Sequence, residues 1–458
     1  MTTTHVPGES RTPTHPINDT DIPSGVVPHL LRKFVEFITP DIQRRIDDIS
    51  KQFTGAGWKN LPQEVVDEIV GYLLDNLAAL KACSLTCKRL FGAMRPLIHQ
   101  RLVCMGRPDK LKRSPFNIPG AFNELIDRDR LGILHYTRHL ALIPTNITGP
   151  HYNPRDIQRY LPHLRSITHL HTLTLFHFHL TPFTPVFDKH FGMFTSTLRY
   201  LDIRYPDGTE RELLYIVSQF SLLEDLTIVS LPGQIVPYLR HPIPKITQSP
   251  PLGGNLALAR GCLTELPDGL AAFPGGLNFR SLELSGCKRP QALLAACGRT
   301  ATSVSYFFGS DADDRESGSL IQVDITTNGT IATPLDLKQN VVLERFEFST
   351  VMTNVPLAHG WVYQTLRSIT SPVFNEFVVW VLNWRQLWEQ PITGDGWKVV
   401  DELLVSLAQR NPGLRVVFMG NGQWSAVVNH LPLTRSKGLF RSGSFQVENP
   451  FRRFGFPD

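Results

Sequence analysis

Three six-residue stretches of this chain share one pattern: LHTLTL at 170–175, LRYLDI at 198–203 and LEDLTI at 223–228. Apolar residues occupy the first, fourth and sixth positions, and FRSLEL at 279–284 repeats the pattern further along. Side chains alternate between the two faces of a strand, so the fourth and sixth residues of each stretch point the same way. The pattern predicts short strands, each with one buried face.

Repeating units that begin with L-x-x-L-x-L resemble leucine-rich repeats. The resemblance implies an α/β solenoid in which parallel strands line a concave wall and helices cover the other face. Helical patterns lie between some of the strands, at 209–220, 288–297 and 397–410. Looser copies of the strand pattern start at Ala301, Leu343, Leu366 and Leu414. An unrelated α/β fold with periodic strands remains the alternative.

Two ranges interrupt the repeats. Residues 231–278 hold eight prolines and seven glycines, which predicts a long irregular insertion with one poor repeat near Leu256. Residues 309–340 begin with an acidic run and reach Asn328-Gly329, which is typical of a hairpin turn. We expect both ranges to form loops at one edge of the solenoid.

Upstream of the repeats, residues 61–91 read LPQEVVDEIVGYLLDNLAALKACSLTCKRLF. Leu61-Pro62 predicts a helix start, because proline is tolerated in the first helical turn. Val65, Ile69 and Leu73 then recur on a helical period. Asp75-Asn76 predict a break, and a second helix is expected from Leu77 through Phe91.

This pair of helices resembles an F-box, with Phe91 at a position where many members carry tryptophan. The resemblance implies docking to a Skp-type adaptor, which attaches such chains to a cullin–RING ubiquitin ligase. It also implies which residues contact the adaptor or support that surface: Leu61, Pro62, Val65, Ile69, Leu80 and Phe91. An ordinary helical hairpin from a larger all-α core is the alternative.

These patterns divide the chain into six parts. They are a disordered N-terminus at 1–28, an amphipathic helical segment at 29–57, the F-box at 58–104, a linker and helical connection at 105–160, the repeat domain at 161–434 and a basic, aromatic tail at 435–458. The amphipathic helix at 41–53 either packs on the F-box or joins two copies in a homodimer. The tail either caps the last repeat or stacks on single-stranded nucleic acid.

Composition narrows the classes of function. The net charge of +5 is small for 458 residues and does not indicate a protein that coats polyanions, so nucleic-acid binding is not the expected role. Six scattered cysteines lack the spacing of a zinc site and indicate free thiols in a reducing compartment, the cytoplasm or nucleus. No secretory signal or membrane-spanning run is apparent.

Catalytic motifs are missing from the sequence: no G-x-S-x-G, Walker loop, G-x-G-x-x-G or H-E-x-x-H occurs. His169 and His171 share a strand face, as do His177 and His179, but no cysteine or carboxylate adjoins them to complete a metal set. We therefore expect a protein that is not an enzyme, with no cofactor and no metal.

The expected function is a substrate-recognition adaptor whose concave wall holds an unidentified target protein. Residues that flank the inward leucines should face the target: Thr172, Thr174, Tyr200, Asp202, Asp225, Thr227, Ser281 and Glu283. Their carboxylates predict a mildly basic or polar target segment. Target contact by the insertions at 231–278 and 309–340 is one alternative. Another is a repeat protein that acts outside any ligase, in association with nucleic acid.

Overall fold

The computed structural model of the chain forms two compact units, residues 1–100 and 101–458. It describes residues 63–73, 77–85, 88–105, 119–143, 161–176, 178, 180–206, 208–229, 250–259, 266–285, 287, 290–308, 333–351, 355–382, 395–420 and 429–441. The predicted helix at 41–53, the hairpin turn at Asn328-Gly329 and most of the tail lie outside these ranges.

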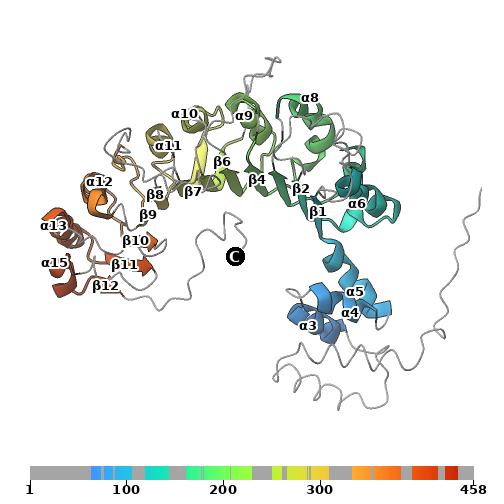
Figure 1. The fold of residues 1–458 in the computed structure, drawn as a ribbon, viewed down its shortest axis with the longest axis horizontal. Helices are drawn as coiled ribbons and strands as arrows, with labels where there is room; N and C mark the ends of the chain where they lie inside the picture. Colours follow the sequence, from blue (N-terminus) through green and yellow to red (C-terminus); the bar gives the residue numbers. More distant parts are fainter. Residues whose placement is uncertain are drawn as a thin grey trace, which may run out of the picture. The chain divides into compact units, whose positions relative to one another are not determined.

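The first unit contains three described helices, α3 (Gln63–Leu73), α4 (Leu77–Ser84) and α5 (Lys88–His99) (Figure 1). The predicted second helix is divided, because α4 ends at Ser84 and Phe91 belongs to α5. One face of each helix meets a small shared core: Val66, Leu73, Ala79, Leu80, Cys83, Leu90 and Met94.

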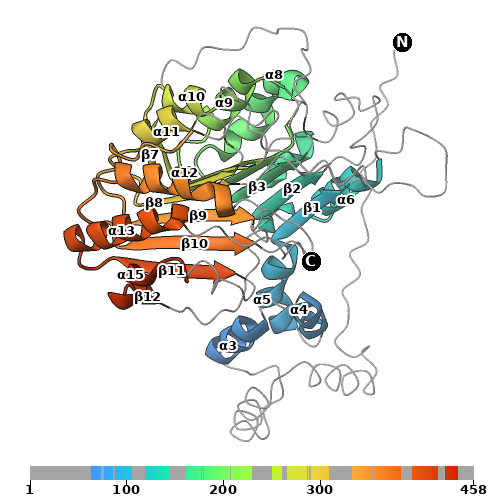
Figure 2. The same cartoon turned by 60° about the vertical axis from the view of Figure 1, so that its left-hand side comes forward.

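The second unit contains one sheet of twelve parallel strands in chain order over the described residues (Figures 1 and 2). The strands are β1 (Arg101–Met105), β2 (His139–Ile143), β3 (Thr172–Phe176), β4 (Tyr200–Arg204), β5 (Asp225–Val229), β6 (Leu252–Ala259), β7 (Leu277–Ser285), β8 (Ser303–Phe308), β9 (Arg345–Val351), β10 (Glu376–Leu382), β11 (Arg415–Gly420) and β12 (Phe440–Arg441). Each strand pairs with the next, as in a solenoid.

The register aligns the inward residue of every unit. Leu173 lies opposite Leu201, which lies opposite Leu226, and the row continues through both ends of the sheet. Its members are at most 1% exposed: Leu102, Leu140, Leu173, Leu201, Leu226, Leu256, Leu282, Val304, Phe346, Phe377 and Val416. This row forms the floor of the main core.

Helices cover the inward face of the sheet along the outer side of the arch in Figure 1. They are α8 (Leu180–Phe191), α9 (Glu210–Ser218), α10 (Leu266–Ala271), α11 (Gln291–Ala296), α12 (Val355–Ser368) and α13 (Asp395–Arg410), with α6 (Pro119–Arg130) beside β1 and α15 (Pro432–Ser436) beside α13. The helical patterns at 209–220, 288–297 and 397–410 thus correspond to α9, α11 and α13. The α/β architecture with a parallel sheet is confirmed.

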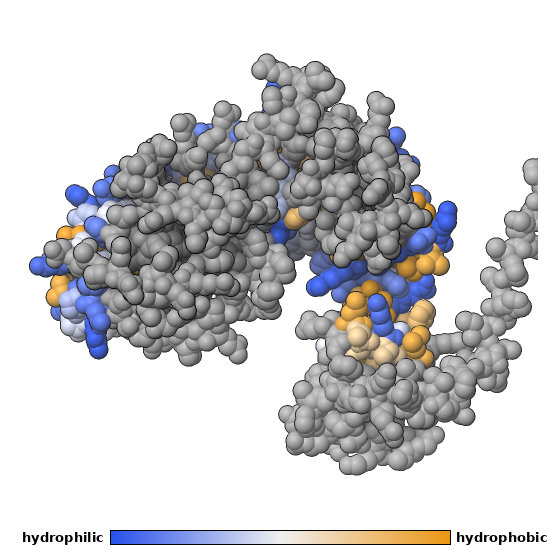
Figure 3. Space-filling model, in the orientation of Figure 1, coloured by the Kyte–Doolittle hydropathy of each residue, from blue (hydrophilic) through white to orange (hydrophobic). Residues whose placement is uncertain are grey.

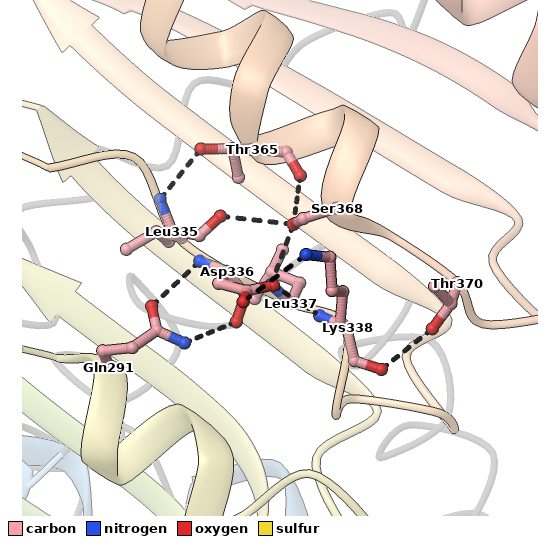
Figure 4. Close-up of polar contacts among 8 residues, drawn as sticks. All are labelled: Gln291, Leu335, Asp336, Leu337, Lys338, Thr365, Ser368 and Thr370. Carbon is pink, nitrogen blue, oxygen red and sulfur yellow. Dashed lines mark hydrogen bonds and ion pairs between the residues drawn. The ribbon is translucent and has the colours of Figure 1, made fainter.

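A described segment that is neither helix nor strand also lies on this side of the sheet. Between β8 and β9, the residues at 333–338 lie beside α11 and α12, and side chains from both helices bond their backbone (Figure 4). Gln291 donates to the Asp336 carbonyl at 2.6 Å and accepts from its N–H at 2.9 Å. Ser368 Oγ accepts from the Leu337 N–H at 2.8 Å. These side chains replace the hydrogen bonds that a helix makes within itself.

The sheet extends past the range predicted for the repeats. It begins at Arg101, inside the range 58–104 assigned to the F-box, and β2 lies in the range 105–160 assigned to a linker and helical connection, which also contains the helix α6. The repeat that contains β2 lacks the full leucine pattern, because Thr137, which is fully buried, stands at the position of its first leucine. The sheet also continues beyond residue 434 to β12.

The ranges 231–278 and 309–340 are not irregular throughout. The first contains β6, α10 and the start of β7, so the repeat expected near Leu256 is real. At the end of the second, Leu335 and Leu337 are buried in the core rather than exposed in a loop. The copy predicted at Leu366 is wrong, because Leu366 belongs to α12 and the strand follows at β10.

Gly254 permits a sharp irregularity in β6. Its φ is +84°, the register shifts between Gly254 and Asn255, and a Cβ there would overlap the backbone of Glu224 on the neighbouring strand connection. Gly276 has a similar φ of +78°, but a Cβ on it would meet nothing within 4 Å. A side chain at Gly276 would therefore cause backbone strain alone, whereas a side chain at Gly254 would cause both strain and steric overlap.

We expect Gly254→Ala to lower the free energy of unfolding by about 3 kcal/mol or more, because strain and overlap add. Gly276→Ala, the matched control, should lower it by only about 1–2 kcal/mol. Urea denaturation followed by circular dichroism measures both. Equal losses in the two variants would contradict the close approach of β6 to Glu224.

Candidate functional site

The residues assigned to the F-box surface have different environments. Leu80 is 2% exposed and belongs to the helical core, so it supports the surface rather than contacting a partner. Phe91 is 44% exposed on α5. Leu61 and Pro62 lie outside the described residues, and so do the side chains of Val65 and Ile69, whose backbone belongs to α3.

Apolar side chains are exposed on α4 and α5. Leu77 and Leu85 are 50% and 65% exposed, and Figure 3 shows apolar surface over these two helices. The guanidinium of Arg95 lies 5.5 Å from the centre of the Phe91 ring, a cation–π distance. We call Leu77, Leu85 and Phe91 the helical patch. Its large exposed side chains are typical of a surface that another protein covers.

The residues assigned to target binding lie side by side on the outward face of the sheet. One row runs Thr172, Tyr200, Asp225, Asn255, Ser281 across β3 to β7, and the next runs Thr174, Asp202, Thr227, Ala257, Glu283. Every one of these residues retains solvent exposure, whereas the leucines between the rows are buried. We call these ten residues the polar wall.

Arginines accompany carboxylates on this face. Arg204 Nε lies 3.0 and 2.9 Å from the two carboxylate oxygens of Asp202. Burial raises the pKa of Asp202, although the hydrogen bond and the charge of Arg204 oppose the rise. The expectation of a basic target counted the carboxylates alone. Arg204 could have been found from the sequence, because residues two apart in a strand share a face.

The C-terminal strands repeat this arrangement. Arg345 lies 2.9 Å from Glu347 on its own strand and 2.8 Å from Glu376 on the next. One guanidinium therefore balances two carboxylates across β9 and β10. On the outward face, Asp202, Glu347 and Glu376 therefore each have an arginine partner.

A serine, an aspartate and a histidine meet beside the first strands. His163 Nδ1 lies 2.6 Å from Asp129, and Ser166 donates to the other oxygen of the same carboxylate. Burial would raise the pKa of Asp129, but these two hydrogen bonds outweigh it and the pKa is lowered. The aspartate lies between the other two, so the histidine is not hydrogen-bonded to the serine as a general base must be. The cluster ties α6 to the short helix at Leu161–Ser166.

Two further findings concern the described residues. They contain no group of three or more His, Cys, Asp or Glu side chains placed to hold a metal ion. None of the helices in that part of the chain combines the length and the apolar character needed to cross a bilayer. Cys83, Cys104, Cys287 and Cys297 are buried and belong to no disulfide, and burial raises the pKa of Cys297 to about 12.

Comparison of the chain with protein-family models gives no match. Comparison with curated proteins gives no similar sequence either. The arguments for function therefore come from the residues themselves.

The raised pKa of Asp202 predicts a pH dependence of stability. A carboxyl with a higher pKa in the folded than in the unfolded chain holds its proton longer when folded, so its contribution to stability falls as pH rises through that interval. We expect the stability of Asp202→Asn relative to the wild type to increase from pH 3.8 upward and level off above the folded pKa. Urea denaturation of both proteins across this range measures the difference. A difference independent of pH would contradict burial of this carboxylate.

Proposed function

We propose that the chain is the substrate-recognition adaptor of a Skp–cullin–F-box type ubiquitin ligase. The observation that carries the proposal is the helical patch, apolar surface on a small helical unit whose sequence has the Leu-Pro start and spacing of an F-box. The parallel repeat sheet that follows offers a long outward face for a target protein.

The proposed mechanism is proximity. The helical patch docks on a Skp-type adaptor, and the polar wall or its neighbours hold a target, so target lysines stay near the conjugating enzyme at high effective concentration. The chain itself forms and breaks no covalent bond. Ubiquitin transfer takes place on partner subunits.

Separate cores support this division of tasks. The seven buried residues of the helical core form one cluster, and the sheet and its helices form another. Substitutions at the surface of one unit should therefore leave the fold of the other intact. Adaptor binding and target binding can then be tested one at a time.

We expect Phe91→Asp to abolish capture of the chain by an immobilised Skp-type adaptor. A carboxylate at the centre of an apolar contact must lose its water without gaining a partner. Met193→Asp is the matched control, because Met193 is also 44% exposed but belongs to the second unit. Pull-down with purified proteins, checked by circular dichroism, measures both variants.

Capture of the wild type no stronger than that of Phe91→Asp would end the ligase proposal and favour a repeat protein that acts outside a ligase. Leu80→Ala tests in a second way whether adaptor binding depends on the folded helical unit. It should destabilise the helical core by about 2–5 kcal/mol, because Leu80 is buried there. Adaptor binding should then fall together with helical content.

A further inference from the structure

Positive groups gather where the first strands of the sheet begin. The backbone links them in sequence: the N–H of His171 donates to the Arg138 carbonyl at 2.8 Å, and the N–H of Arg199 donates to the His171 carbonyl at 2.9 Å. Arg138, His171 and Arg199 directly precede the first residues of β2, β3 and β4. We define the basic cluster as Arg101, Arg138, His139, His169, His171 and Arg199.

The side chains of this cluster are accessible and held in place. Arg138 donates to the His169 carbonyl at 3.2 Å, and Arg199 donates to the Leu222 carbonyl at 3.4 Å. His139 Nδ1 lies 2.9 Å from the Thr172 hydroxyl. Arg101, His169 and His171 are exposed, and the other three are half-buried. The positive groups are therefore positioned before any partner arrives.

Electrostatics shows that the six groups act on one another. Burial lowers the pKa of His139, and the charges of Arg101 and His171 lower it further. Burial also lowers the pKa of His171, with Arg138, Arg199 and His169 adding to the effect and Glu224 opposing it. The lasting positive charges of this region are therefore those of Arg101, Arg138 and Arg199, which lie close enough to act on the two imidazoles.

The positive region has a limited length. Neighbouring strands lie about 4.8 Å apart, so β1 to β4 span about 14 Å, the length of about four extended residues. Beyond them, β5 presents Asp225, preceded by Glu224, which lies 3.2 Å from Arg199. A long polyanion would meet these carboxylates, whereas a short acidic segment would end before them.

The exposed Tyr200 lies beside this region on β4. It is 45% exposed, between Thr172 and Asp225 in the polar wall. Tyrosine and arginine are common anchors at the centres of protein interfaces. Single-stranded nucleic acid needs several aromatic faces for stacking, and Tyr200 is the exposed aromatic side chain that the described part of β1–β5 provides.

We propose that the basic cluster binds a short acidic segment of a target protein, an extended run of Asp and Glu that crosses the starts of β1 to β4. The inference deepens the proposed function by naming the chemistry of the target, and it rests on target binding by the repeat sheet. It differs from the expectation, drawn from the carboxylates of the polar wall, of a mildly basic or polar target segment.

The test uses the full chain without any adaptor and a fluorescein-labelled Gly-Asp-Glu-Asp-Glu-Gly peptide. Fluorescence anisotropy should detect binding that weakens with salt, and the peptide with Asn and Gln in place of Asp and Glu should not bind. Arg138→Gln/Arg199→Gln should weaken binding roughly tenfold or more, since two charge contacts are lost. Arg280→Gln is the matched control, because Arg280 is exposed at the corresponding position before Ser281 on β7.

Proton linkage gives a second measurement that needs no arginine variant. Bound carboxylates favour the charged imidazoles, so the complex holds more protons than its parts and affinity should rise as pH falls from 8 to 6. The ratio of the affinities at pH 6 and pH 8, measured for each protein by itself, should be much smaller for His139→Gln/His171→Gln than for the wild type. This result is readable even if the arginine variant fails to fold.

Equal binding by the wild type and the folded arginine double variant would overturn the proposal. So would affinity that does not rise on acidification, or tighter binding of a short oligothymidylate through the same arginines. Adaptor pull-down stays a separate measurement. Peptide binding without adaptor binding would refute the ligase proposal alone, and adaptor binding without peptide binding would refute this inference alone.

Discussion

The parallel register of the sheet is the constraint on which the second unit depends. Every strand must place its inward residue opposite that of its neighbour, because a slip of one residue would turn all of its side chains to the other face. The row from Leu102 to Val416 satisfies this condition across eleven strands, with no member more than 1% exposed. Burial of one such side chain contributes about 2 kcal/mol, and each strand adds its share only when its neighbours are in register.

The return segments are less constrained than the strands. They must fill the space above the inward row and satisfy their own backbone, and several local structures meet both needs. Helix α9 does so with a capping box, in which Thr209 and Glu212 bond each other's backbone N–H groups. The segment at 333–338 does so with Leu335 and Leu337 in the core and with Gln291 and Ser368 on its backbone. Length and composition between strands can therefore vary while the sheet persists.

This difference explains what could be predicted from the sequence. Strands with a full L-x-x-L-x-L pattern, such as β4 and β5, were predictable in position and in their inward residues, because the apolar spacing sets which residues align in the register. The strand β2 was hidden by Thr137, and β6 lay within a range rich in proline and glycine. Composition averages over a window, so the repeat expected near Leu256 could be located in this range but the bounds of its strand could not. The segment at 333–338 has no periodic pattern that would predict it, since the side chains that bond its backbone come from α11 and α12.

The outward face was predicted in position but not in chemistry. Spacing places Asp202 and Asp225 outside the core and opposite Thr227 and Tyr200 in the register of the sheet, but it does not give the charges that surround a carboxylate, such as Arg204 beside Asp202. The basic cluster shows this most clearly, because Arg138, His171 and Arg199 precede three different strands, β2, β3 and β4.

The fold does not require the basic cluster. The inward rows supply the stability. Burial and, after it, the neighbouring positive charges lower the pKa of His139 and His171, so these two groups reduce the stability as pH falls through their titration. Positive charges that the core does not need, gathered at some expense to stability, are the kind of local conflict that function explains. On this surface, the physical cost of the arrangement is the argument for a negatively charged partner.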